Sequence, residues 1–177
     1  MKLDQAVIPG ALQAIKYAER LLQGLTVAPI ADVKLSERPV VGGVPIVINH
    51  PTFTFGHLAI YPALMAELLH VPSTIVEVPD NYPTLFKIGT PCVNDPDGTI
   101  YPPLAELTER FFKGMHHIIG VLPTISDEVL AEELQDAGRK ERFGSVGPFV
   151  AYLLTAHPMT HLGQLSAWRR CVGLPSV

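Results

Sequence analysis

Cysteine is scarce in this chain, and long uninterrupted apolar runs are missing. The two cysteines, Cys92 and Cys171, are too few for a disulfide framework, so we expect both to be reduced thiols. The longest apolar runs, such as residues 44–48, are far shorter than the roughly 20 residues that a membrane helix needs. The first residues, 1–5, have no apolar core for a signal peptide. We therefore expect a cytoplasmic protein with no membrane-spanning segment.

Positive charge is also sparse. The chain has 13 Lys and Arg against 17 Asp and Glu, which gives a net charge of -4. A nucleic-acid-binding surface normally needs clustered cations. The doublets at residues 139–140 and 169–170 are typical of helix ends and do not make a basic patch. We therefore expect no nucleic-acid partner.

Several catalytic signatures are absent as well. The sequence has no Cys-x2-Cys pair, no glycine-rich phosphate loop and no Ser-His-Asp arrangement. The zinc-protease helix motif is also excluded, because Pro158 follows His157 where that motif has Glu. The histidines remain as candidates for chemistry.

What the sequence does contain is the pattern of one helical domain over residues 1–177. With 47% hydrophobic and 17% charged residues, the chain is typical of a compact domain with a substantial core. Each long helical segment carries a single apolar stripe at helical spacing. This pattern predicts an all-α fold, a four-helix bundle with long crossover connections. The predicted helices cover residues 9–25, 50–69, 102–121, 127–136 and 147–172.

Local signals set the expected ends of these helices. Pro9 suits the first turn of the first helix, Asn49 is a plausible N-cap of the second, and Ser126 should cap the short helix. Gly138 should end the short helix and Gly173 the last one.

Proline also shapes the interior of helices and the connections. Pro62 and Pro158 lie inside predicted helices and should bend them, because proline removes one backbone hydrogen bond. Residues 26–48 are a connection that contains at most short extended pieces. Residues 71–100 form a long segment with a turn at 95–98, and this segment is either a lid over a pocket or a plain crossover.

Three histidines fall on the stripes that should face the core. His157 and His161 are four residues apart, so they lie on one side of the last helix about one turn apart. His57 lies on the stripe of the second helix. If these helices are neighbours, the three rings offer three ligands to a divalent metal and leave one position open, as in catalytic sites. The alternative is that each ring is a core residue hydrogen-bonded to a carbonyl or hydroxyl, and spacing alone leaves both readings open.

Two segments resemble the DinB/YfiT-like family of helical bundles. Residues 53–59, Phe-Thr-Phe-Gly-His-Leu-Ala, are similar to the Gly-His-Leu segment in that family's second helix. Residues 157–164, His-Pro-Met-Thr-His-Leu-Gly-Gln, with Trp-Arg-Arg and Gly-Leu-Pro after them, resemble its final helix and ending. The resemblance implies that His57, His157 and His161 bind a divalent metal, often nickel or zinc, in a bundle that is commonly dimeric. Pro158 departs from the family, where an acidic or other helix-forming residue is more common, and so it could distort or abolish the site.

The resemblance further implies a metal-dependent enzyme with a small-molecule substrate. Its ion would activate either a low-molecular-weight thiol, as in a thiol S-transferase, or water, as in a hydrolase. A hydrolase is the weaker option because no carboxylate lies beside the histidines to act as general base. His50, about two turns before His57, is a weak candidate for a group that supports the site or accepts a proton, although a histidine at a helix start is more often exposed.

A different class of function stays open beside the enzyme. The chain could be a non-catalytic helical bundle that serves dimerisation or ligand binding, with a vestigial metal site. In either case we expect a homodimer. Arg169 and Arg170 could meet a substrate carboxylate, but cations at a helix end need no such role. Trp168 is expected in the core, and Cys171 is too far along the helix to ligate beside His161.

Overall fold

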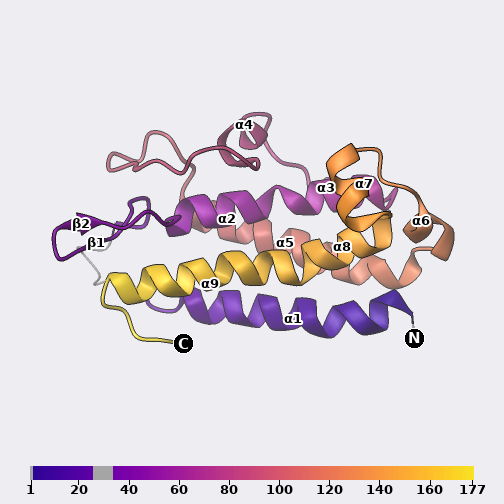
Figure 1. Ribbon diagram of the computed structural model, residues 1–177, viewed down its shortest axis with the longest axis horizontal. Coiled ribbons are helices and arrows are strands. Elements are labelled where there is room, and N and C mark those ends of the chain that lie inside the picture. The colour runs from indigo at the N-terminus through magenta and orange to yellow at the C-terminus, as the bar shows by residue number, and fades with distance from the viewer. Residues whose placement is uncertain (1, 26–33) are drawn as a thin grey trace.

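Helices account for most of the chain that the computed structural model describes, which comprises residues 2–25 and 34–177 (Figure 1). A hairpin of β1 (Val40–Val41) and β2 (Val44–Pro45) is the one sheet in these residues. The mostly helical structure agrees with the predicted all-α class. The helices are α1 (Leu3–Leu22), α2 (Pro51–Ala59), α3 (Tyr61–Leu68), α4 (Tyr82–Phe86), α5 (Leu104–Val121), α6 (Asp127–Ala131), α7 (Ala137–Phe143), α8 (Val146–Leu154) and α9 (Ala156–Cys171), with a 3-10 turn at Leu122–Thr124.

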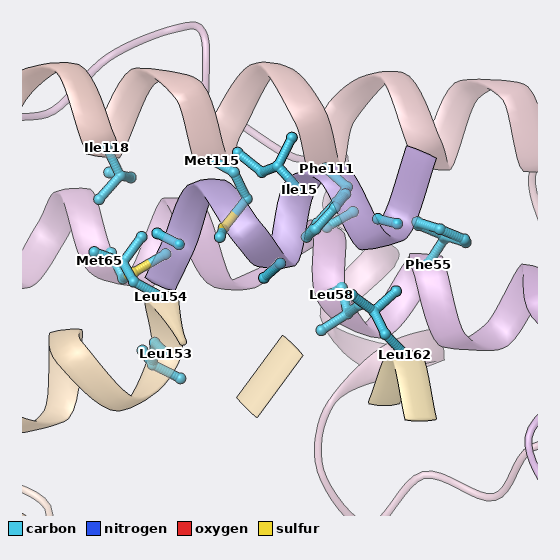
Figure 2. Packing of buried hydrophobic residues seen from close by; sticks show 14 of the residues in the cluster. Ile15, Phe55, Leu58, Met65, Phe111, Met115, Ile118, Leu153, Leu154 and Leu162 are labelled. Carbon is cyan, nitrogen blue, oxygen red and sulfur yellow. The ribbon is translucent and has the colours of Figure 1, made fainter. Parts of the chain in front are cut away.

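The long helices lie alongside one another and share a core (Figure 1). α2 packs on α5 and α9, α1 packs on α8 and α9, and α3 packs on α5. Their apolar stripes face inward, as the helical spacing predicts. Figure 2 shows side chains from several of these helices in contact, among them Phe55, Leu58, Phe111, Met115 and Leu162, all of which are buried.

Two helices that the sequence predicts as continuous are each interrupted. The predicted helix 50–69 is α2 and α3, with the break at Ile60, and the predicted helix 147–172 is α8 and α9, with the break at Thr155. Each break lies two or three residues before a proline, Pro62 or Pro158, as expected when proline lacks the backbone N–H and crowds the preceding turn. The interruptions predicted from these prolines are confirmed.

Several predicted boundaries are wrong at the first helix and the start of the second. α1 begins at Leu3 and contains Pro9 in its interior, because Val7 extends the buried stripe upstream. The N-cap of α2 is His50 and not Asn49, since His50 Nδ1 accepts a hydrogen bond of 3.1 Å from the Phe53 N–H. The part of the predicted connection at 26–33 lies outside the described residues.

The region after α5 also differs from the prediction. Ser126 caps α6 as expected, but α6 ends at Ala131, and Gly138 lies inside the unpredicted helix α7. The chain between α6 and α7 is held extended instead, because Glu133 pairs with Ser145 in an antiparallel bridge. Gly173 has a φ of 79° just after α9, so its predicted role as a stop is confirmed.

The segment 71–100 packs onto the body of the protein and contains α4, which the sequence did not predict. The expected turn is present, with a hydrogen bond from the Gly98 N–H to the Asp95 carbonyl. The buried Asp95 carboxylate accepts hydrogen bonds from the N–H groups of Thr99, Ile100 and Tyr101 at 2.9–3.0 Å. Of its apolar residues, Val76 and Phe86 are buried in the core and Val78 and Leu85 pack against it, whereas Ile75 and Ile88 are exposed.

Arg169 has a structural role at the end of α9. Its side chain is buried, and its Nη1 donates to the carbonyls of Leu21 and Gln23 at 2.7 and 2.9 Å. It thereby satisfies carbonyls at the end of α1, which have no partner within that helix. Trp168 is buried in the core as predicted, and its Nε1 donates to the Glu37 carbonyl.

Replacing Asp95 by Asn should lower the free energy of unfolding at pH 7, because an amide oxygen accepts the same N–H groups less strongly than a carboxylate. Burial alone would raise the pKa of Asp95, but the backbone N–H groups of Tyr101, Thr99, Ile100 and Gly98 together lower it. A folded-state pKa below the unfolded value means that this stabilisation is present above about pH 4 and is lost as the pH falls through the folded pKa.

Urea unfolding of both proteins at a series of pH values measures this effect. The difference in the free energy of unfolding between the wild type and Asp95→Asn should be largest near neutral pH and should shrink below about pH 4. An advantage that is the same at every pH would show that the carboxylate charge does not matter.

Candidate metal centre

The three histidines singled out from the sequence meet where α2 and α9 pack together. His57 comes from α2, and His157 and His161 come from the first turns of α9. The ring centroids are 5.3 Å apart for His57 and His157, 4.6 Å for His57 and His161, and 4.7 Å for His157 and His161. One nitrogen from each ring lies within 4.8 Å of the other two. The predicted convergence of the rings is confirmed, whereas metal binding by them stays a prediction.

A backbone carbonyl fixes the orientation of His57. Its Nδ1 donates a hydrogen bond of 2.6 Å to the Phe86 carbonyl at the end of α4. The proton is therefore on Nδ1, and the lone pair of Nε2 points toward His157, whose Nε2 lies 3.3 Å away. A histidine held by a carbonyl in this way is the usual arrangement of a metal ligand.

Gly56 allows this hydrogen bond to form. A Cβ at position 56 would lie 2.1 Å from the Phe86 ring, which is far inside van der Waals contact. Only glycine therefore lets α4 approach α2 closely enough for the Phe86 carbonyl to reach His57. The Phe86 ring then packs against Phe53 and Tyr101, with centroids 6.0 and 5.7 Å apart.

The break between α8 and α9 places His157 and Pro158 in the first turn of a new helix. Residues in this turn have no internal partner for their N–H groups, so proline is tolerated there. At the end of α8, the Thr155 hydroxyl donates to the Ala151 carbonyl at 2.6 Å. Pro158 thus sets where α9 begins, and the two histidines of α9 keep ring contact with His57.

All three imidazoles are neutral at physiological pH. Burial, with the neighbouring histidines, lowers the pKa of His157 to about 3 and that of His161 to about 4. Burial also lowers the pKa of His57, although the Phe86 carbonyl acts in the opposite direction. Neutral imidazole is the form that binds metal. Among the described residues, the buried Nδ1 atoms of His157 and His161 have no hydrogen-bond partner.

These residues fit a divalent cation of the kind that imidazole favours. Three neutral nitrogens converge, one is oriented by a backbone carbonyl, and no carboxylate or thiol of the described residues belongs to the cluster. Such a donor set suits zinc, nickel, copper or iron, and three protein ligands leave a position for a further group.

The histidines lie in the wall of a cavity of about 530 Å³. Tyr61 and Tyr152 stand beside them, with ring centroids 4.4 and 5.6 Å from that of His157. Residues 87–90 of the long segment form part of the wall, and α7 contributes Arg139 and Arg142. Burial raises the pKa of the Tyr61 hydroxyl, and the positive charge of Arg139 opposes this shift.

Sequence reasoning assigned no role in the site to the tyrosines and arginines of this cavity. Both tyrosines lie on predicted helices but close to a break. Tyr61 directly follows the break at Ile60, and Tyr152 lies about one turn before the break at Thr155. Near such a break, helical spacing does not give the direction of a side chain. Arg139 and Arg142 were missed because α7 was not predicted. Nothing in the local sequence indicates that α7 packs on α8 and lines the same cavity as the histidines.

The other candidate residues do not join the centre. His50 is fully buried, not exposed, and both its nitrogens are engaged, since Nδ1 accepts from Phe53 and Nε2 donates to the Val93 carbonyl at 2.8 Å. It is therefore a helix cap that also holds the long segment, with no nitrogen left for a substrate. Cys92 and Cys171 are free thiols outside the histidine cluster.

No family model, no curated protein and no solved structure matches the chain. No helix in the described residues is both long and apolar enough to cross a membrane.

Replacing Gly56 by Ala should destabilise the fold by about 1–3 kcal/mol, because the new methyl group overlaps the Phe86 ring. The matched control is Gly120→Ala in α5, where an added Cβ meets nothing within 4 Å and should stabilise the helix by up to about 1 kcal/mol. Denaturant unfolding measures both. Equal stability of the two variants would show that the close approach of α4 is not required.

Replacing His161 by Ala should abolish uptake of zinc or nickel and leave a folded helical protein, because the site is an addition to a large apolar core that the substitution leaves in place. Elemental analysis after metal loading measures the uptake, and circular dichroism measures the fold. The control is His116→Ala, which removes an exposed histidine of α5. Wild-type protein should take up about one equivalent, and an unchanged content in His161→Ala would show that the ligand is wrongly chosen.

Proposed function

We propose that this chain is a metal-dependent enzyme built on a DinB/YfiT-like four-helix bundle. In this proposal His57, His157 and His161 hold one divalent ion, nickel or zinc. The observation that carries the proposal is the meeting of three neutral imidazoles in a cavity wall, with their nitrogens within 4.8 Å of one another. The packing of α1, α5 and the two interrupted helices along one another supports the bundle.

The chemistry follows from the donor set. An ion with three protein ligands is a Lewis acid that lowers the pKa of a thiol or water in its open position. The chain supplies orientation through the hydrogen bond from His57 to Phe86. It also supplies a partly closed cavity, in which Tyr61 and Tyr152 flank the histidines.

Transfer of a thiol is favoured over hydrolysis because, in the described residues, no carboxylate belongs to the histidine cluster to act as its general base. Among the described residues that line the cavity, the one carboxylate is Asp136, and its Oδ1 accepts the hydrogen bond that caps α7. His50 is engaged at both nitrogens. Activated water needs a group that accepts its second proton or guides its attack, whereas a thiol needs only to lose one proton.

The tyrosines give the cavity its hydrogen-bonding capacity near the histidines. Among the described residues neither Tyr61 nor Tyr152 has a hydrogen-bond partner for its hydroxyl, and both side chains are partly exposed to the cavity. A phenol can donate to an oxygen or halide of an electrophile as negative charge develops there. We therefore assign these hydroxyls to substrate orientation.

A second, wider hollow of about 880 Å³ lies along α5, but it offers less for chemistry. Its charged residues are already paired, since Glu106 bonds Arg110 and Glu109 bonds Lys113. His116 and His117 also line this hollow and belong to no metal-binding group in the described residues. We therefore propose the histidine cluster, and not this hollow, as the site of function.

The test is a thiol-transfer assay on metal-loaded protein. With cysteine or glutathione and 1-chloro-2,4-dinitrobenzene, the sulfur bonds to the ring carbon, chloride leaves, and the thiol proton passes to the buffer. We expect the rate to exceed the uncatalysed rate by at least about a hundred-fold, and to fall to background after chelation or in His161→Ala. Product absorbance measures the reaction.

The same experiment separates the alternatives. Metal uptake without thiol transfer, but with hydrolysis of an activated ester, would replace the transferase with a hydrolase. A protein that takes up neither zinc nor nickel would favour the non-catalytic bundle, because the cluster would then be a set of core histidines.

A further inference from the structure

The cavity has an arginine-bearing wall that the metal chemistry does not use. Arg139 and Arg142 are three residues apart on α7, so they lie on the same side of that helix. Both line the cavity that contains the three histidines. Lys140 lies between them in sequence, does not line the cavity, and pairs with Glu133 at 2.8 Å. The two arginines differ from their neighbour in having no ion-pair partner among the described residues.

Aromatic rings support both guanidinium groups. The Cζ of Arg139 lies 5.3 Å from the centroid of the Phe149 ring, and the Cζ of Arg142 lies 5.0 and 5.1 Å from those of Phe143 and Tyr152. Contact with a ring face stabilises the cation and leaves the N–H groups at the edge of the guanidinium plane free to donate. These groups are thus held in place without a protein acceptor.

The charge of the cavity is opposite to that of the chain. The protein has an excess of acidic residues, yet the described residues that line the cavity carry three cations, Lys87, Arg139 and Arg142, against the single carboxylate of Asp136. The Oδ1 atom of Asp136 caps α7, and its single negative charge offsets only part of the positive charge of the cavity. Unpaired cations that converge on a partly closed cavity in an acidic protein favour an anionic ligand.

One tyrosine connects the arginine wall to the histidines. The Tyr152 ring lies against Arg142 on one side, and its centroid is 5.6 Å from that of His157. A ligand that pairs with the guanidinium groups therefore reaches the histidines by crossing an aromatic surface formed by Tyr152 and Tyr61. Its body must be apolar, since aromatic side chains line this path.

We propose that the cavity binds a small oxyanionic substrate, whose carboxylate or phosphate group pairs with Arg139 and Arg142 and whose apolar body lies on Tyr61 and Tyr152 with its reactive end at the histidines. This inference rests on the proposed function, because it names the class of molecule on which that site acts. Arginine presents paired N–H donors that match either oxyanion.

Isothermal titration calorimetry with matched probes tests the proposal. The probes are 4-phenylbutyrate, 3-phenylpropyl phosphate and the neutral 4-phenylbutanol, which share an aromatic body and differ in the charged group. Metal-loaded wild-type protein should bind at least one of the anions about ten-fold or more tightly than the alcohol. The two anions distinguish a carboxylate from a phosphate ligand.

The variants assign the effect to the arginines. The double variant Arg139→Gln/Arg142→Gln should lose the preference for the anion, while Lys140→Gln on the other side of α7 should keep it within about two-fold. Arg142→Gln alone, at an exposed position, should lose part of the preference without a change in folding. Metal content should be equal in all of these proteins.

A titration in the His161→Ala background excludes direct binding of the anion to the ion. The preference should persist there, because the arginines are unchanged. Equal binding of acid and alcohol, no binding of either anion at millimolar concentration, or loss of the preference in Lys140→Gln would overturn the proposal. If the wild-type protein takes up no metal but still prefers the anion over the alcohol, the proposed metal-dependent function is wrong, whereas the proposed anion site at Arg139 and Arg142 is supported.

Discussion

The hydrogen bond between His57 Nδ1 and the Phe86 carbonyl is the contact on which the arrangement of the cavity depends. It joins the second helix to the long segment that follows α3, and it exists because Gly56 carries no side chain where the two backbones meet. The same contact fixes the tautomer of His57 and so directs the Nε2 lone pair toward α9. One small residue therefore controls both the packing of α4 and the chemical state of the first histidine.

Burial of the three rings creates the conditions for cation binding. Removal from water keeps the imidazoles neutral, so that they present nitrogen lone pairs at physiological pH. Among the described residues, Nδ1 of His157 and Nδ1 of His161 are buried without a hydrogen-bond partner, which is costly. A cation bound by the converging nitrogens would give these rings a compensating interaction. Stability of the cluster and its proposed chemistry thus have the same physical origin.

The two proline-induced interruptions have different consequences. The break at Ile60 lies between His57 and Tyr61, and both residues still reach the cavity. The break at Thr155 starts a new helix just before His157, so the proline that departs from the DinB/YfiT-like pattern lies in a first turn, where it disturbs no internal hydrogen bond. Between α6 and α8, the extended chain and α7 bring two arginines to a wall that the long helices alone would leave open.

The sequence by itself determined the helical class, the inward faces of the long helices and the three histidines, because helical periodicity and the positions of proline are local properties of the chain. It also indicated Ser126 and Gly173 as helix ends, since caps act within one turn. Only the tertiary structure decided that α4 and α7 exist, that His50 is a buried cap, and that Tyr61, Tyr152, Arg139 and Arg142 surround the histidines. These features rest on contacts between residues far apart in the sequence, such as His57 with Phe86 and Tyr152 with His157 across a helix break, and no local pattern encodes such contacts.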